Sequence, residues 1–106
     1  MSKIVNEVHF DNVREAIMQG KMFDDETEEM LSMISMNNLN PGVSHPRDRD
    51  RAIDTFRDLY KRGQLPDPIL IERWALQRGW ISSEARDLRN IAQAVSEGKK
   101  LRKASL

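Results

Sequence analysis

The chain has 106 residues, of which 39% are hydrophobic and 32% charged, with 17 basic and 17 acidic side chains and no cysteine. This length supports one domain with a modest core, and the composition excludes a fully disordered chain, a disulfide framework and cysteine-based metal or redox chemistry. No apolar run is long enough to cross a bilayer and the N-terminus lacks a secretory signal, so we expect a single soluble domain over 1–106 in the cytoplasm.

Two helices are predicted in the acidic first part of the chain, after a flexible segment over 1–9. The first covers Asp11–Gln19, where an aspartate can cap the free amides and apolar residues recur on one face. The second covers Asp25–Met36, because Asp25 and Glu28 have the spacing of a capping box and the local acids suit the positive end of the helix dipole. Its predicted buried stripe is Met30, Leu31 and Ile34.

The middle of the chain predicts two further helices, which a loop over 37–44 separates from the second. One begins near Ser44–Pro46, with serine as cap and proline in the first turn, and ends at Arg62. The next begins at Asp67-Pro68, a cap followed by a proline, and ends at Gly79. The predicted buried stripe of the first of these helices is Ala52, Ile53, Phe56, Leu59 and Tyr60. In the second, one face carries Ile71, Trp74 and Ala75, and Arg78 is a further candidate for that face.

A fifth helix is predicted from Ser82 or Ser83, either of which would cap it, to about Glu97, and a basic flexible tail follows over 99–106. The stripe of this helix is Ala85, Leu88, Ile91, Ala92 and Val95. Glycines that suit a left-handed C-terminal residue follow the last three helices, at Gly63, Gly79 and Gly98. Because no segment shows the period of a strand, we predict an all-α fold, a compact bundle of about five short helices with consecutive helices as neighbours.

The second half of the chain also carries an ordered set of apolar and glycine positions. These are Phe56, Leu59, Gly63, Ile71, Ala75, Gly79-Trp80, Leu88, Ala92 and Gly98. In this order, about residues 53–100 resemble the small, uncharacterised all-helical bacterial family typified by YoaC. The resemblance implies a compact helical domain of bacterial origin. It carries over no functional residue, because that family has no assigned activity.

Methionines indicate a candidate interaction surface. All six lie between Met1 and Met36, and methionine suits adaptable binding grooves as well as irregular gaps in a core. Two of them fall partly off the buried stripe of the second helix, and tryptophan is enriched at binding hot spots. The candidate interaction residues are Met30, Met33, Met36 and Trp80. Core packing is the alternative for the methionines, as is a structural role for the two tryptophans, with Trp74 in the core and Trp80 over the glycine turn.

A nucleic-acid-binding role is the second interpretation. The fourth and fifth predicted helices, with their short turn, have the dimensions of a helix-turn-helix. The candidate contacts are Arg86, Arg89, Asn90, Gln93, Lys99 and Lys100. Acidic residues in the same helix and a net charge of zero oppose this interpretation, because nucleic-acid binding depends on positive charge.

Acidic clusters have ordinary explanations in this sequence. The group at 24–29 suits a helix start and lacks the pattern of a calcium loop, so a basic partner, including the chain's own tail, is the functional alternative. Asp50, Asp54 and Asp58 share one helix face, where interleaved arginines predict solvated ion pairs such as Arg47 with Asp50 and Asp48 with Arg51.

Recognisable catalytic patterns are missing. The two histidines lie far apart at His9 and His45, and there is neither a nucleophile motif nor a phosphate-binding glycine loop. We therefore expect no enzyme, no cofactor and no metal site. The prediction is a protein-interaction or self-association module, with a homodimer as one form, and a nucleic-acid-binding regulator as the alternative.

Overall fold

The computed structural model describes residues 22–104 and contains four helices and no strand within that range. The helices are α2 (Asp25–Ser32), α3 (Pro46–Lys61), α4 (Pro68–Gln77) and α5 (Ser82–Ser96). The all-α prediction is confirmed for this part of the chain, with four helices instead of about five. The helix predicted over Asp11–Gln19 and the flexible segment over 1–9 lie outside the described residues.

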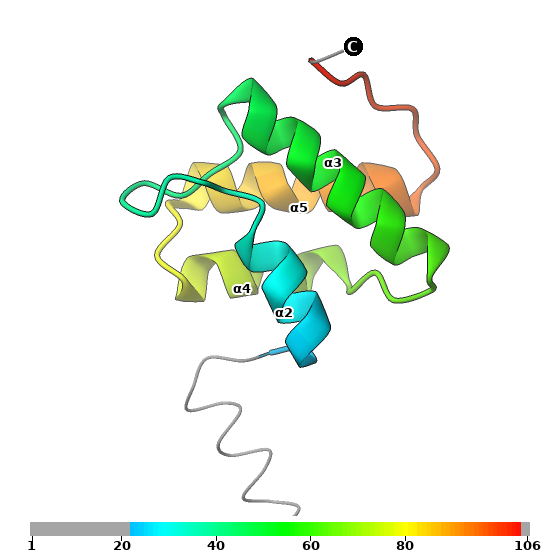
Figure 1. The fold of residues 1–106 in the computed structure, drawn as a ribbon, viewed down its shortest axis with the longest axis horizontal. Coiled ribbons are helices and arrows are strands. Elements are labelled where there is room, and N and C mark those ends of the chain that lie inside the picture. Colours follow the sequence, from blue (N-terminus) through cyan, green and yellow to red (C-terminus); the bar gives the residue numbers. More distant parts are fainter. Residues whose placement is uncertain (1–21, 105–106) are drawn as a thin grey trace, which may run out of the picture.

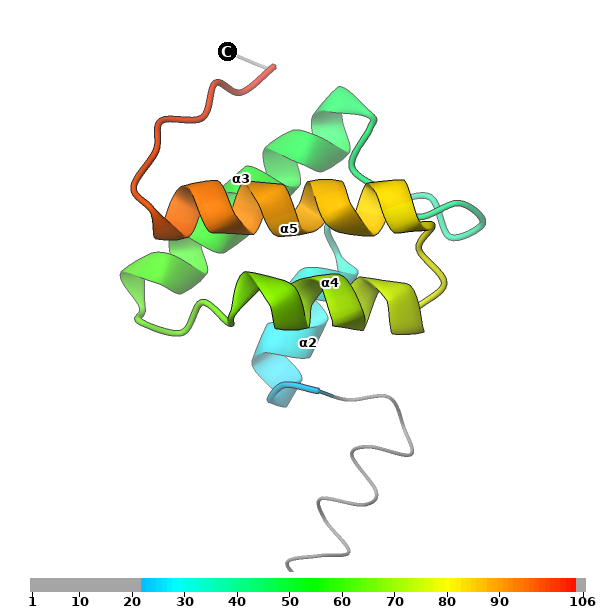
Figure 2. The same cartoon turned by 180° about the vertical axis from the view of Figure 1, so that it is seen from behind.

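α5 lies at the centre of the arrangement (Figures 1 and 2). It packs against α4 on one side and α3 on the other, and α2 packs against α3. The prediction that consecutive helices are neighbours is wrong for α3 and α4, which make no close backbone approach. α5 lies between these two helices and contacts both.

The buried apolar side chains of the four helices form one cluster. All five residues of the stripe predicted for the last helix are buried in it: Ala85, Leu88, Ile91, Ala92 and Val95. The prediction that Tyr60 belongs to the buried stripe of α3 is wrong, because 52% of this residue is exposed. It lies in the last turn of α3, and periodicity does not report how far the neighbouring helices extend.

The helix starts follow the predicted positions, but two of the three caps after α2 differ. Asp67 caps α4 as predicted, and its carboxylate accepts an N–H at 2.9 Å. His45, not Ser44, caps α3, and its Nδ1 accepts an N–H at 3.1 Å. α5 has Ile81 at its cap position and no side-chain cap, because Ser82 is already the first helical residue.

α2 ends at Ser32 rather than at Met36. Two contacts hold the residues that follow this end. The carbonyl of Ile34 accepts a hydrogen bond from Arg51 Nε of α3 at 3.0 Å, and the hydroxyl of Ser35 accepts one from the backbone of the following loop at 3.0 Å. Residues 34 and 35 are thus held by α3 and by the loop, outside the helix. The amphipathic period of the sequence predicts neither contact.

Asp24 caps α2 in place of the predicted Asp25, and its carboxylate accepts the Thr27 N–H at 2.8 Å. The hydrogen bonds from the Thr27 backbone and then from its side chain lower the pKa of Asp24. A lowered folded-state pKa contributes stability above the unfolded-state pKa of about 3.9, and this stability is lost as pH falls through the folded value.

We therefore expect Asp24→Ala to lower the urea midpoint of unfolding at pH 7 and to differ less from the parent chain as pH falls below about 4. Urea titrations followed by circular dichroism from pH 7 to pH 2.5 test this expectation. Asp25→Ala, at the exposed neighbouring position, is the matched control. A difference between parent and Asp24→Ala that does not change with pH would contradict the assignment of the cap.

Candidate functional site

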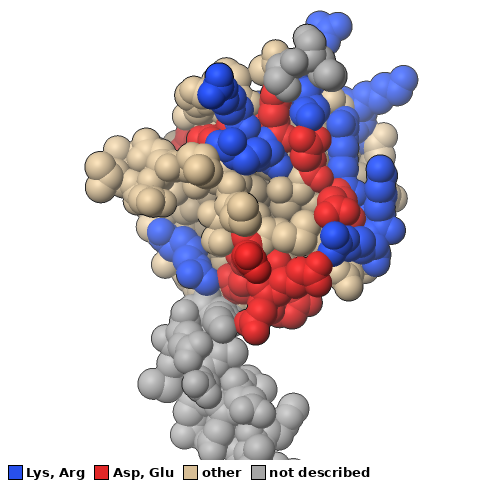
Figure 3. All heavy atoms as spheres, in the orientation of Figure 1, with Lys and Arg blue, Asp and Glu red and all other residues tan. Residues whose placement is uncertain are grey.

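The loop between α2 and α3, residues 33–45, exposes three large apolar side chains and carries no charged one. It projects beyond the helices in Figure 1, and the same protrusion is free of charged side chains in Figure 3. Met33 is 61% exposed, Met36 69% and Leu39 90%. No Asp, Glu, Lys or Arg occurs in the loop, in a chain of which 32% is charged.

Backbone hydrogen bonds hold this α2–α3 loop in one conformation. Asn37 Oδ1 accepts the N–H groups of Leu39 and Asn40 at 3.1 and 3.0 Å, which makes a local turn. At the other end of the loop, Glu84 Oε1 accepts the N–H groups of Val43 and Ser44 at 2.7 and 2.9 Å. The exposed apolar side chains are therefore presented by an ordered backbone, which lowers the entropic cost of binding.

Gly42 is the residue that allows the loop to approach α5. A Cβ at this position would lie 2.7 Å from Cδ and 2.8 Å from Cγ of Glu84, and would also overlap its Oε1. Since that oxygen accepts two backbone N–H groups, any side chain at Gly42 would displace the carboxylate that anchors the loop.

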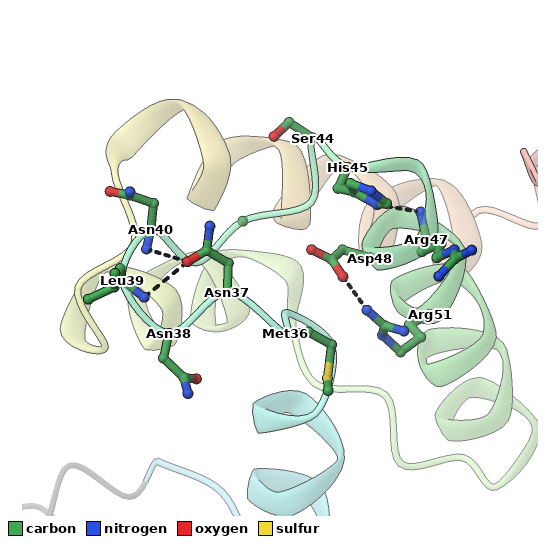
Figure 4. A pocket seen from close by; sticks show the side chains of 11 residues that line it. Met36, Asn37, Asn38, Leu39, Asn40, Ser44, His45, Arg47, Asp48 and Arg51 are labelled. Atoms are coloured by element: carbon green, nitrogen blue, oxygen red, sulfur yellow. Dashed lines mark hydrogen bonds and ion pairs between the residues drawn. The ribbon is translucent and has the colours of Figure 1, made fainter.

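A pocket of about 730 Å³ lies between the α2–α3 loop and the start of α3 (Figure 4). Its walls are Met36, Asn37, Asn38, Leu39, Asn40, Gly42, Ser44, His45, Arg47, Asp48 and Arg51. On the α3 side, Asp48 is 8% exposed and forms the predicted ion pair with Arg51. The pocket thus combines apolar side chains, loop amides and one ion pair.

The structure separates the four predicted interaction residues into two environments. Met33 and Met36 are exposed on the α2–α3 loop, and Met30 is half-buried against the core. Trp80 is only 6% exposed, and its ring packs edge-to-face on Trp74 with centroids 6.1 Å apart. The structural alternative for the two tryptophans, with Trp74 in the core and Trp80 over the glycine turn, accords with these positions.

Leu39 is the exposed residue that sequence reasoning missed. It is a lone leucine among asparagines in a segment that was predicted to be a loop. That contrast is a usable signal, because a large apolar residue in a turn has no helix face to bury it.

Glu28 of α2 is the centre of a buried polar cluster. It is 7% exposed, whereas the sequence placed it in a capping box at the start of the helix. Its Oε1 accepts the N–H groups of Met22 and Phe23 at 2.7 and 3.2 Å. Its Oε2 accepts from Trp74 Nε1 and from Arg78 Nη2, both at 2.7 Å. This carboxylate joins the segment before α2 to α4, which is a structural role.

The candidate nucleic-acid residues of α5 lie among acidic partners. Arg89 forms an ion pair with Glu72 of α4 at 2.8 Å, and Gln93 donates to Glu97 at 3.0 Å. Glu97 also pairs with Lys99 at 3.1 Å, and the hydrogen bonds from Gln93 and then from Lys99 lower the pKa of Glu97. The other three candidates are exposed: Arg86, Asn90 and Lys100.

The basic tail lies along α3 as far as the structure describes it. Arg49 Nη1 donates to the carbonyl of Arg102 at 2.9 Å, and Arg57 Nη2 donates to the carbonyl of Leu101 at 3.0 Å. Asp50 is 6% exposed and accepts the backbone N–H of the tail residue 104 at 2.8 Å. The prediction of a solvated carboxylate row is therefore wrong at Asp50, because the tail covers it.

Within residues 22–104, no three His, Asp or Glu side chains gather closely enough to hold a metal ion. In the same range, each helix is too short or too polar to span a bilayer.

Comparison with known proteins returns one match. The model of a family described as a domain of unknown function, DUF1889, matches residues 24–105. No curated protein and no solved structure matches the chain.

Proposed function

We propose that this chain, which belongs to the DUF1889 family of uncharacterised domains, binds another protein through the α2–α3 loop. We further propose that the protein acts in the bacterial cytoplasm by binding and not by catalysis. The resemblance to the family typified by YoaC is also part of this proposal. The observation that carries it is the exposure of Met33, Met36 and Leu39 on one uncharged loop.

Exposed apolar side chains with a polar rim are a feature of protein interfaces. The α2–α3 loop has this composition, because its methionines and leucine alternate with asparagines and serines beside the pocket. Methionine adapts its shape to a partner at low cost, and the anchored backbone limits the entropy lost on binding. The partner that fits is an apolar side chain with neighbouring backbone groups that pair with the side-chain amides of Asn38 and Asn40.

A nucleic-acid partner has less support. The α2–α3 loop carries no charge, and the net charge of the whole chain is zero. The cation of Arg89 already has Glu72 as its partner, so counterion release would depend on the few remaining cations of α5 and the tail. An electrophoretic shift assay at low salt separates this alternative from the proposal.

The proposal is tested by photo-cross-linking followed by affinity measurement. A benzoyl-phenylalanine in place of Asn38, on the pocket wall, identifies the protein that contacts the loop in cells. With that protein purified, we expect Met36→Ser/Leu39→Ser to weaken binding at least about tenfold, because two anchoring side chains are truncated. Isothermal titration and sedimentation, the second to detect a homodimer, provide the measurements.

The matched control is Ile69→Ser/Leu76→Ser, which removes two apolar side chains that are 56% and 44% exposed on α4. We expect this control to bind as the parent chain does. Equal loss of affinity in both double variants, or unchanged affinity in Met36→Ser/Leu39→Ser, would overturn the proposal that the loop is the binding surface.

A further inference from the structure

The segment after α5 follows α3 without secondary structure of its own. Residues 99–103 have no helical or strand assignment, and their order depends on contacts with α3 and the core. Four side chains on one face of α3 make these contacts, and we call them the tail site: Arg49, Asp50, Asp54 and Arg57. Their spacing along the helix places these four side chains on one face of α3, where they line the path of the extended tail.

Three of the four contacts are made with the backbone of the tail. Arg49 and Arg57 donate to two successive carbonyls, those of Arg102 and Leu101, at 2.9 and 3.0 Å. Asp50 accepts the N–H of Ala104 at 2.8 Å. Backbone groups are common to all sequences, so these contacts recognise an extended chain as such.

Two side chains of the tail supply selectivity. Leu101 is partly buried and packs against the apolar core, and it also borders a cavity of about 360 Å³ with Val43 and Ile91. Lys103 Nζ forms an ion pair with Asp54 Oδ2 at 2.8 Å. The tail site therefore favours a leucine followed two residues later by a lysine.

We propose that the tail site is a recognition site for an extended basic segment with a Leu-x-Lys pattern, which the chain's own tail fills and a partner protein occupies by displacing it. Two observations support exchange. The tail leaves α5 at Gly98, whose φ of +72° ends the helix, so it can detach without unwinding α5. The groups that the tail site engages are backbone carbonyls, a backbone N–H and one lysine, and an extended segment of another chain can present the same groups. The proposal does not involve Met33, Met36 or Leu39, the exposed apolar residues of the α2–α3 loop.

The test uses the full chain and a fluorescent peptide of residues 99–106, KKLRKASL. In the parent chain the tethered tail competes at an effective concentration of about 1 mM. In the full-length variant Leu101→Asp/Lys103→Glu the tail no longer fits, and we expect the peptide to bind this variant at least about tenfold more tightly than the parent. Fluorescence anisotropy measures both affinities.

Two matched controls identify the contacts. A peptide with the same two substitutions is expected to bind neither protein. In a variant that combines Leu101→Asp with Asp54→Lys, whose own tail keeps Lys103 and does not fit, the natural peptide is expected not to bind and a peptide carrying only Lys103→Glu is expected to bind. This charge reversal distinguishes a specific ion pair from general attraction. Unchanged peptide binding in Met36→Ser/Leu39→Ser would show that the exposed part of the α2–α3 loop takes no part in it.

The inference is overturned if the peptide binds parent and tail variant with equal affinity, or fails to bind a tail variant whose circular dichroism matches that of the parent. If the double variant does not fold, Lys103→Ala provides the second arm. It preserves the packing of Leu101, and it is expected to raise peptide affinity by a smaller factor. No increase in that variant would equally overturn the inference.

Discussion

Replacing Phe56 by alanine is expected to lower the free energy of unfolding by about 3–5 kcal/mol, the largest effect among the substitutions considered. Phe56 lies in the middle of α3, has no exposed surface and belongs to the single buried cluster that the four helices share. Truncation removes buried apolar area and leaves a cavity that the packed helices fill only in part. Urea denaturation followed by circular dichroism at 222 nm measures the change.

Tyr60→Ala is the matched control one turn further along α3. Tyr60 is 52% exposed, so we expect its truncation to change the free energy of unfolding much less, by about 0.5 kcal/mol. Phe56→Leu is expected to remain folded with a smaller loss of about 1–2 kcal/mol, in case the alanine variant does not fold. Similar losses at both aromatic positions would contradict the arrangement of the core around α3.

Glu28→Gln is expected to cost about 2–4 kcal/mol, although the change retains the size of the side chain. The carboxylate accepts four hydrogen bonds, two from backbone N–H groups and two from Trp74 and Arg78. A glutamine has one acceptor oxygen, and its amide N–H groups would face donors on the other side. The buried Trp74 N–H or the two backbone N–H groups would therefore lose their partner.

Glu29→Gln tests whether the position matters rather than the loss of a charge from α2. Glu29 is exposed in the same helix, and we expect less than about 0.5 kcal/mol of change. Trp74→Phe, alone and together with Glu28→Gln, completes a double-mutant cycle. Two losses that simply add would show that Glu28 and Trp74 do not interact, against the contact at 2.7 Å.

The same polar contacts connect the fold to the candidate surface. Glu28 holds the chain before α2, Ser35 holds the loop that follows α2, and Glu84 holds the far end of that loop. Because these anchors are side chains of the folded domain, the loop presents Met36 and Leu39 only when the core is formed. We therefore expect partner binding and unfolding to be linked, with the bound protein more resistant to urea.

Sequence reasoning was most accurate where local rules decide. The buried stripe of α5 follows from its period, and Asp67 caps α4 because a carboxylate before a proline satisfies a free amide. Gly63, Gly79 and Gly98 all have the positive φ that a helix end favours. These features depend on neighbours within a few residues, so the order of amino acids contains the information.

Features that depend on distant residues were missed or wrong. α2 ends at Ser32 and the Ile34 carbonyl beyond it accepts from Arg51 of α3, and Glu28 is buried because Trp74 and Arg78 lie opposite it. Two exposed residues of the candidate surface, Met33 and Met36, were predicted from the sequence. The other part of this surface, the pocket beside Leu39, required the start of α3 to fold back against the loop.

The amino-acid sequence by itself therefore determined that residues 22–104 are helical, about where their helices begin and which faces are apolar, since backbone propensity and period act over one or two turns. Only the tertiary structure decided which polar groups are buried, where the tail lies and which methionines remain exposed. These outcomes depend on side chains that approach from distant helices, and amphipathic period does not record the direction of that approach.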